Sequence, residues 1–404
     1  MLNRDIQSNT YAPISAMSAD PQVSILMPCL NEARSLPKAV ETATAALNEL
    51  KQQGLSGEIV ISDNGSSDGS QDIARRLGCR VVYARVKGYG SALRAGVSAC
   101  RGKYIIMGDA DASYDFREAV AMVRKLAEGY EICMGTRLKG EIMSGAMPWK
   151  NRWIGNPILT GILNLFFHSG FSDAHCGLRA FTKEAFEKMQ ITSSGMEFAS
   201  EIVVKAALMN LRRTEVPVTL YPDKRNNPPH LRPLRDGWRH LKFLLVYSPL
   251  WCFIIPSFVG MGFGALLLTA LLVTPPGKNF WIGRIWFGDH WLIIASSAII
   301  VGYHLWLSGM TALVYFSKRL ESAPNRFVAF AKKFMTIENV CLVGTTLILV
   351  GLLVLGYVLA RWTEAGFGQL NMIRLMTLGA TLITIGIQTF FSGFLISLFK
   401  EDEY

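Results

Sequence analysis

Two aspartates separated by one residue, Asp109 and Asp111, follow the apolar run Tyr104-Ile105-Ile106-Met107. This run has the length and composition of a buried strand, so both carboxylates are expected directly beyond a strand end. Open α/β sheets bind their ligands at that edge. Carboxylate oxygens suit Mg²⁺ or Mn²⁺, which proteins hold with one or two carboxylates together with substrate phosphates. The simpler alternative is a turn that merely contains two aspartates, because Asp favours turns.

Three further polar loops follow predicted strands. Runs rich in apolar and branched residues predict strands at 23–27, 58–62, 80–83, 103–107 and 131–134, with helical segments between them. This alternation predicts an α/β fold with a mostly parallel sheet and right-handed crossovers. The strand ends then meet at one edge, where the loops 28–32, 63–68 and 87–90 should join the Asp109 turn. Such a group of loops suits a nucleoside diphosphate bound with a metal ion.

Several other site types are excluded by their missing residues. Gly88-Tyr89-Gly90 is not a dinucleotide-binding fingerprint, because Leu93 stands in place of the third glycine and the sequence follows the third strand. No G-x-x-x-x-G-K-[ST] sequence occurs, which argues against a P-loop NTPase. The seven cysteines form no C-x-x-C pair, so we predict neither a disulfide framework nor a zinc site.

The chain changes character near residue 245. Half of its 404 residues are hydrophobic, but the long apolar runs all follow that point. Four of them, at 250–273, 291–316, 340–360 and 373–399, reach the roughly 20 residues that a spanning helix needs. Because charged connectors separate the runs, we predict an all-α membrane domain of four transmembrane helices rather than buried core helices.

The basic residues indicate how these helices are oriented. Lysine and arginine gather before the first run and between the second and third, which places both segments in the cytoplasm. The residues are Lys224, Arg225, Arg232, Arg235, Arg239, Lys242, Lys318, Arg319, Arg326, Lys332 and Lys333. We therefore predict a multi-pass protein of the inner (plasma) membrane, with both termini and the α/β domain cytoplasmic. The net charge of +10 is then explained by attraction to anionic membrane lipids or to a lipid phosphate. No nucleic-acid partner is predicted.

Four regions follow from these patterns. Residues 1–21 are polar, predicted to be disordered, and hold no signal-peptide core. Residues 22–235 form the predicted cytoplasmic domain, 236–248 a basic amphipathic helix in the headgroup layer, and 249–404 the membrane domain. The apolar segment 157–167, with Trp149 and Trp153 before it, is too short to span and is expected at the membrane interface, with a short core helix as the alternative.

Four short motifs, taken together, resemble one enzyme family. They are Pro28-Cys29-Leu30-Asn31-Glu32, Asp63-Asn64-Gly65-Ser66-Ser67-Asp68, Asp109-Ala110-Asp111 and Gly135-Thr136-Arg137. In this combination the chain, over roughly residues 22–247, resembles the inverting GT-A-fold glycosyltransferases of family 2. Within these it is most similar to polyprenyl-phosphate sugar transferases such as dolichyl-phosphate mannose synthases. The resemblance implies a GT-A, Rossmann-like domain.

The resemblance also implies a role for each matching residue. Nucleotide-sugar binding would fall to Pro28, Leu30, Glu32, Asp63, Asp109, Ala110 and Asp111. The metal, Mg²⁺ or Mn²⁺, would be held by Asp109, Asp111 and Ser113, and catalysis would involve Asp111, Arg137 and Asp173. The acceptor phosphate would be bound by some subset of Arg137, Arg225, Arg232 and Arg239.

The expected reaction moves a sugar from a UDP- or GDP-sugar to a polyprenyl phosphate, undecaprenyl or dolichyl. A phosphate monoester has a second pKa near 6, so the nucleophile is already ionised and needs no strong base. His175 beside Asp173 suits either a base or metal role or a structural hydrogen bond. A processive polysaccharide synthase is the nearest alternative, although no Q-x-x-R-W sequence occurs. A non-catalytic membrane protein of lipid-carrier export is another, and homo-oligomerisation stays open.

Overall fold

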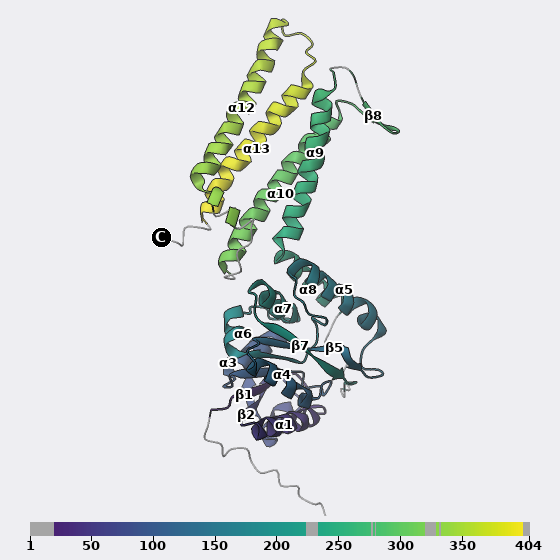
Figure 1. Ribbon diagram of the computed structural model, residues 1–404, viewed down its shortest axis with the longest axis vertical. Coiled ribbons are helices and arrows are strands. Elements are labelled where there is room, and N and C mark those ends of the chain that lie inside the picture. The colour runs from purple at the N-terminus through teal and green to yellow at the C-terminus, as the bar shows by residue number, and fades with distance from the viewer. Residues whose placement is uncertain are drawn as a thin grey trace, which may run out of the picture. The chain divides into compact units, whose positions relative to one another are not determined.

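The computed structural model describes residues 20–223, 233–275, 278, 280–319, 329–330 and 333–398. The chain forms two compact units, Met1–Leu244 and Leu245–Tyr404 (Figure 1). Each unit has hydrophobic clusters of its own.

A seven-stranded sheet forms the centre of the first unit. Its strands are β1 (Val23–Cys29), β2 (Gly57–Asp63), β3 (Arg80–Tyr83), β4 (Tyr104–Met107), β5 (Ile132–Ile142), β6 (Arg179–Thr182) and β7 (Arg213–Leu220). They lie in the order β3-β2-β1-β4-β6-β5-β7. β6 is antiparallel to both of its neighbours, and the other pairs are parallel. The mostly parallel α/β sheet predicted from the sequence is confirmed. The start of β6 therefore lies at the same edge as the ends of β1, β2 and β4.

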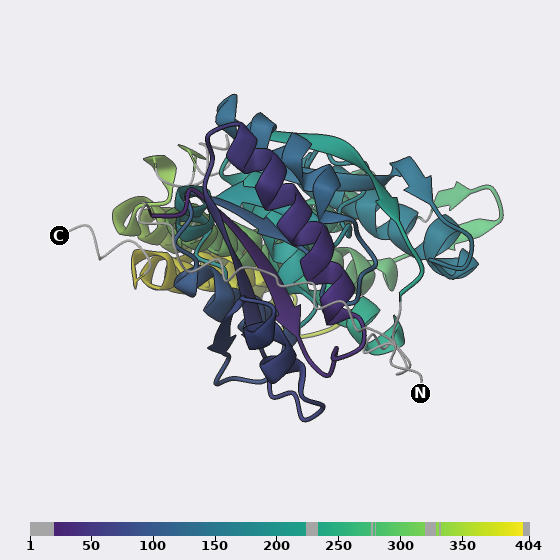
Figure 2. The same cartoon turned by 90° about the horizontal axis from the view of Figure 1, so that it is seen from below.

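Helices connect these strands and follow the last of them. They are α1 (Leu36–Gln52), α2 (Ser70–Arg76), α3 (Tyr89–Ala99), α4 (Ala119–Ala127), α5 (Asn156–Phe167), α6 (Lys183–Met189), α7 (Phe198–Leu208) and α8 (Pro233–Val246). The 3₁₀ turn η1 (Phe116–Glu118) precedes α4, and the π turn η2 (Asn151–Gly155) precedes α5. Figure 2 shows α1 lying across one face of the sheet. Its buried residues Leu36, Ala39, Ala43, Ala46 and Leu50 recur at helical spacing and form the stripe that packs there.

The strand β1 shows how the two faces are filled. Val23, Ile25 and Met27 are completely buried and belong to the cluster that includes α1 and α4. Leu26 points to the opposite face, where it approaches Gly96 of α3, as expected for a strand whose successive side chains alternate. The strand was predicted to end before Pro28 but continues to Cys29. Pro28 has no backbone N–H, and the strand tolerates this because β1 pairs with β4 only as far as Leu26.

The second unit contains four long apolar helical segments. They comprise η3 (Leu250–Ile254) with α9 (Ile255–Val273), α10 (Trp291–Arg319), α12 (Ile337–Glu364) and α13 (Ile373–Leu398). All four are long and apolar enough to cross a membrane, so the four predicted spans are confirmed as helices. A two-stranded hairpin, β8 (Phe280–Ile282) and β9 (Ile285–Phe287), lies between α9 and α10. α12 extends beyond the predicted 340–360 because polar residues at both ends stay helical, and Thr336 caps its start by accepting from Asn339 N–H.

Glycines let neighbouring membrane helices approach closely. A Cβ atom at Gly344 of α12 would lie 2.6 Å from Phe390 N and 2.8 Å from Gly386 O of α13. The helix α13 also contacts α10, through two pairs of hydroxyl groups. These are Ser296–Thr381 at 2.7 Å and Tyr303–Thr389 at 2.6 Å. The α12–α13 contact is therefore a backbone contact, whereas the α10–α13 contact depends on polar side chains.

Candidate active site

The turn after β4 holds both aspartates of the Asp109-Ala110-Asp111 motif. Gly108 N–H donates to Leu26 O at 3.1 Å, which ties the start of the turn to β1. Asp111 is buried, and its Oδ1 accepts from Ser113 N–H at 2.9 Å. Ala112 has φ +61°, a left-handed conformation that costs a residue with a Cβ about 1–2 kcal/mol. Such strain is typical of a functional turn that the surrounding fold holds in place.

A cavity of about 510 Å³ lies beside this turn. The predicted convergence of four loops is confirmed, because each loop contributes to its walls. The lining residues are Pro28, Cys29, Leu30, Glu32, Asn64, Gly65, Lys87, Gly88, Tyr89, Ala92, Asp109, Ala110, Asp111, Met196 and Asp223. We call this space the first cavity.

Asp63 organises the loop that borders the first cavity. Its buried carboxylate accepts from Gly65 N–H at 3.0 Å and from the Gln71 side chain at 2.7 Å. The next residue, Asn64, lines the cavity and joins two loops. Its amide donates to Val86 O at 2.9 Å, and its Oδ1 accepts from Gly88 N–H at 2.7 Å. An aspartate could not make both bonds, because it has no N–H to donate.

Glu32 is also buried in the wall of the first cavity. Its Oε2 accepts from Ser35 Oγ at 2.8 Å, and its backbone N–H donates to Ser70 Oγ at 2.9 Å. The loop after β1 is thereby fastened to the start of α2. Pro28, Leu30 and Ala110, which the sequence also assigned to nucleotide-sugar binding, line the same cavity.

A second cavity of about 670 Å³ shares five lining residues with the first: Tyr89, Asp109, Asp111, Met196 and Asp223. Its own walls include Ser113, Tyr114, Arg137, His175, Arg179 and His240, together with apolar residues such as Ala146, Met147, Pro148, Ile154, Ile158 and Leu159. The two carboxylates therefore border both spaces. Met196 and Asp223 were not selected from the sequence, because only the folded chain brings them to this wall. Tyr89 lies in the predicted loop 87–90 but was not singled out.

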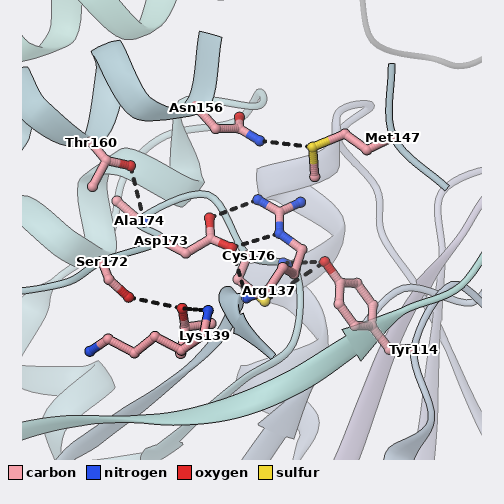
Figure 3. A network of polar contacts seen from close by, with 12 residues as sticks. Tyr114, Arg137, Lys139, Met147, Asn156, Thr160, Ser172, Asp173, Ala174 and Cys176 are labelled. Carbon is pink, nitrogen blue, oxygen red and sulfur yellow. Dashed lines mark hydrogen bonds and ion pairs between the residues drawn. The ribbon is translucent and has the colours of Figure 1, made fainter. Parts of the chain in front are cut away.

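Arg137 and Asp173 form a buried ion pair beside the second cavity. Arg137 Nε donates to Asp173 Oδ2 at 2.7 Å and Nη2 donates to Oδ1 at 2.8 Å, in the forked geometry of Figure 3. The Arg137 backbone N–H adds a bond of 3.1 Å to Oδ2. Burial opposes the charge on Asp173, but the Arg137 guanidinium prevails and lowers the pKa of that carboxyl. Both residues stay charged, and Arg137 is presented to the cavity in a fixed orientation.

The segment before β6 approaches Asp109 closely. A Cβ atom at Gly177 would lie 2.6 Å from Asp109 Oδ2, so a larger residue here would displace that carboxylate. Tyr114 Oη accepts from Gly177 N–H at 3.0 Å. The Arg179 guanidinium donates to Cys176 O, Ala199 O and Ala174 O, which fixes the same segment. Arg179 is buried and bound to backbone carbonyls in this way, so its role here is structural.

His175 lines the second cavity and has a hydrogen bond, as in the structural alternative. Its Nε2 lies 3.4 Å from Ser200 Oγ, which in turn lies 2.8 Å from His240 Nδ1. Among the described residues, none is a hydrogen-bond partner of His175 Nδ1. Burial, followed by the nearby His240, lowers the pKa of His175 to about 3. The imidazole is therefore neutral near pH 7.

The basic residues predicted to bind the acceptor phosphate are placed differently. Arg137 borders the second cavity, whereas Arg239 is exposed on α8, beside Gly195. Arg225 and Arg232 lie outside the described residues. Lys150, which the sequence did not single out, lines the second cavity and is exposed.

The carboxylates at the shared wall fit a divalent cation bound with a phosphate ligand. Within the ranges that the structure describes, no three His, Cys, Asp or Glu side chains gather as a complete metal site. Asp109 and Asp111 would then supply one or two oxygens, and Ser113 lies beside them on the second cavity. Mg²⁺ is commonly held in this way, with its other ligands from phosphates and water. The donor chemistry of the shared wall suits Mg²⁺ or Mn²⁺ accordingly.

The segment 146–159, which lines the second cavity, also exposes apolar side chains. Trp149, Trp153 and Ile158 have exposed fractions of 63%, 69% and 55%. Ile158 also lines the second cavity, together with Ile154 and Leu159 of the same segment. Exposed apolar groups of this kind are typical of interaction surfaces. The helix α5, which contains Ile158, also buries Thr160, Leu163 and Phe167, so the interfacial position of this segment stays a prediction.

Comparisons with known proteins agree with this architecture. Residues 24–190 match the family model described as glycosyl transferase family 2, and residues 310–400 match that of the glycosyltransferase family 2 C-terminal transmembrane region. The chain is 34% identical, over 390 residues, to the low-salt glycan biosynthesis hexosyltransferase Agl6 of Haloferax volcanii, covering 95% of this chain and 92% of that protein. It is 31% identical over 295 residues to glycosyltransferase AglJ of the same organism, covering 71% and 91%.

A solved structure also aligns with part of the chain. Glucosyl-3-phosphoglycerate synthase from Mycobacterium tuberculosis, in complex with Mn²⁺, UDP-glucose and phosphoglyceric acid, is 20% identical with a TM-score of 0.45. The alignment covers 56% of this chain and 80% of that one.

Proposed function

The chain belongs to glycosyltransferase family 2, and from that membership we propose that it transfers a hexosyl group, with inversion, from a UDP- or GDP-sugar to a polyprenyl phosphate. The observation that carries this proposal is the wall between the two cavities. Asp109 and Asp111 border both spaces, so a donor in one and an acceptor in the other would meet beside them. The hexosyl group is supported by the relative Agl6, which is named a hexosyltransferase.

On this proposal the first cavity binds the nucleotide. Its walls offer the small loop residues and backbone amides of the four converging loops, with Pro28 and Leu30 as apolar contacts. Its volume of about 510 Å³ lies in the range of small-molecule pockets. Asp63 holds the loop whose residues Asn64 and Gly65 face the cavity.

Charge develops on the nucleoside diphosphate as it leaves the sugar. A divalent ion bound by Asp109 and Asp111 would neutralise that charge. The chain itself holds the two carboxylates in place, because the strained Ala112 and the Asp111–Ser113 bond fix the turn. Groups that are already oriented need no reorganisation during the reaction, which favours the transition state.

The second cavity suits an amphiphilic acceptor. Its apolar wall, from Ala146 to Leu159, would contact the first isoprene units, while Arg137 would bind the phosphate. Asp173 orients the Arg137 guanidinium, and an oriented guanidinium binds phosphate better than a mobile one. The phosphate is largely ionised at neutral pH, so it attacks the anomeric carbon without a strong general base. Attack from the side opposite the diphosphate inverts that carbon.

The membrane unit brings this site to an acceptor that stays in the bilayer. Under the proposal residues 22–235 are the cytoplasmic catalytic domain, 236–248 a juxtamembrane helix and 249–404 the membrane domain. Lys318 and Arg319 at the end of α10 would be cytoplasmic, and the protein would be multi-pass in the plasma membrane with both termini in the cytoplasm. The exposed Trp149 and Trp153 would lie in the headgroup layer.

A transfer assay tests the proposal. The full chain, purified in detergent, would receive labelled UDP-glucose, UDP-N-acetylglucosamine or GDP-mannose, with undecaprenyl or dolichyl phosphate and Mg²⁺ or Mn²⁺. We expect label to enter the organic phase, and the transferred sugar to have the opposite anomeric configuration to that in the donor. Asp111→Asn should abolish transfer. Asp72→Asn is the matched control, because Asp72 is exposed and pairs with Arg75 on the surface.

Other outcomes would identify the alternatives. Products that lengthen with time would indicate a processive polysaccharide synthase. Absence of both transfer and nucleotide-sugar binding would support a non-catalytic protein of lipid-carrier export.

A further inference from the structure

Tyr89 stands between two glycines whose backbone packs directly on another loop. A Cβ atom at Gly88, where φ is +133°, would lie 2.2 Å from Ser194 O, and one at Gly90 would lie 2.5 Å from Ser193 O. Ser91 N–H donates to Ser194 O at 3.2 Å, which closes the contact. Only glycine permits this approach on both sides of Tyr89. The two glycines thus fix the position of the tyrosine.

The opposing loop is itself held firmly. Glu201 is completely buried and accepts from Thr192 N–H at 3.0 Å and from Ser193 N–H at 2.8 Å. Lys205, also buried, pairs with Glu201 at 2.6 Å and donates to Gln190 O at 2.7 Å. An ion pair that satisfies several backbone groups at once makes the loop a rigid support. Tyr89 is therefore placed by a chain of contacts that begins inside α7.

The Tyr89 side chain ends at Asp109. Its hydroxyl donates to Asp109 Oδ1 at 3.1 Å, and its ring packs edge-on against Phe198, with centroids 6.5 Å apart. A tyrosine hydroxyl is ordinarily protonated at neutral pH, so it is the donor in this bond and the carboxylate is the acceptor. Gly177 approaches the other carboxylate oxygen, Oδ2. Asp109 is thus confined on both sides.

We propose that Tyr89 is a positioning residue that orients the Asp109 carboxylate for a divalent cation bound with a nucleoside diphosphate. The inference deepens the proposed function and rests on it. Hydrogen bonds to a metal-binding carboxylate fix its rotamer, and losing such a partner typically weakens metal binding by about 10- to 100-fold. Tyr89 acts through Asp109, so its hydroxyl should affect the cation far more than the nucleotide alone.

Tyr89→Phe tests this, because it removes the hydroxyl and keeps the ring against Phe198. Binding of Mn²⁺ to the full chain in detergent would be measured by electron paramagnetic resonance with saturating UDP or GDP. Nucleotide binding without metal would be measured by calorimetry. We expect Mn²⁺ to bind about 10- to 100-fold more weakly to Tyr89→Phe, with metal-free nucleotide binding and the melting temperature unchanged. The matched control is Tyr83→Phe, because Tyr83 is 55% exposed and contacts Arg75 on the surface.

A second comparison uses Asp109→Asn. If Tyr89 acts through the carboxylate, adding Tyr89→Phe to Asp109→Asn should produce no further loss of Mn²⁺ binding. Equal Mn²⁺ binding by Tyr89→Phe and the unmodified chain would overturn the inference. So would a parallel loss of melting temperature and metal-free nucleotide binding, which would make Tyr89 a packing residue only. If the unmodified chain bound nucleotide but no Mn²⁺, the metal assignment would be wrong, and the inference with it. If it bound no nucleotide, the proposed function itself would fail.

Discussion

The Arg137–Asp173 pair allows stability and function to be separated by mutation. The side chains are 9% and 1% exposed, and three hydrogen bonds join the two residues. Removing one partner of such a buried pair leaves the other charged and unpaired, at a cost of about 3–5 kcal/mol. Replacing both partners by apolar residues of similar volume is often neutral, because the cost of burying charge disappears as well. Asp173→Leu and Arg137→Met should therefore each be strongly destabilising, and the double variant should recover most of the stability.

Pulse proteolysis in urea would measure this on the full chain in detergent, by following digestion of the first unit separately from the membrane helices. Because the two single costs together reach about 6–10 kcal/mol and the double variant should cost little, the coupling between the two substitutions should approach that sum. A coupling below about 0.5 kcal/mol, which is the usual value for independent sites, would refute the reasoning. The recovered double variant also tests the proposed role of Arg137. It should be folded but should show a strongly raised KM for polyprenyl phosphate, and an unchanged KM would remove Arg137 from the acceptor site.

Three further predictions concern single positions. Since His175 is neutral in the fold with a pKa of about 3, whereas an unfolded histidine titrates near 6.5, the unfolding free energy should fall as the pH drops from 6.5 towards 3. The loss is at most about 2 kcal/mol at pH 5, because this pH lies about 1.5 units below the unfolded pKa and each unit corresponds to about 1.4 kcal/mol. Urea unfolding of His175→Gln should lack this pH dependence, and an identical slope in both proteins would contradict it. Ala112→Gly should raise the urea midpoint of the first unit by the equivalent of about 1 kcal/mol, because φ +61° suits glycine, and a lower midpoint would argue against strain. Gly386→Leu should lower the melting temperature of the membrane helices, because even a Cβ there would lie 2.8 Å from Gly344 O, and an unchanged melting temperature would mean that the helices separate easily.

Local patterns predicted much of the first unit. The strand before Asp109 is a short apolar run, and the loops after β1 and β2 contain Asp, Asn, Gly and Ser, so their convergence at one edge follows from the parallel sheet alone. The four long apolar helices could also be predicted from the sequence, since a run of about 20 apolar residues is typical of a membrane-spanning helix. The uncertain parts were helix and strand ends, such as β5, which continues to Ile142 instead of ending at Met134. β5 continues because it pairs with β7 across a register shift, which no local pattern reveals.

Long-range contacts explain what the sequence did not predict. The direction of β6 is fixed by its neighbours β4 and β5, and only that direction brings His175 and Gly177 to the site. The motif Asp63–Asp68 does not reveal what Asn64 does, which is to donate from its amide to Val86 O and to accept from Gly88 N–H. In the sequence, Tyr89 is only the middle residue of an incomplete glycine motif. Its contact with Asp109 is visible only in the folded chain. In each case the partner lies at least 20 residues away in the sequence.

The two kinds of helix contact in the membrane unit have a mechanical consequence. The close glycine contact between α12 and α13 resists sliding, because a shift would bring residues with Cβ atoms to positions where a Cβ would lie within 2.8 Å of the partner helix's backbone. The α10–α13 contact is different. Thr381 and Thr389 donate their hydroxyl hydrogens to carbonyls of their own helix, so Ser296 and Tyr303 must be the donors across the interface. When the two bonds between the helices break, both threonines keep the hydrogen bonds that they donate within α13. The α12–α13 pair is therefore expected to move as one rigid body. Any sliding would occur at the contact between α10 and α13.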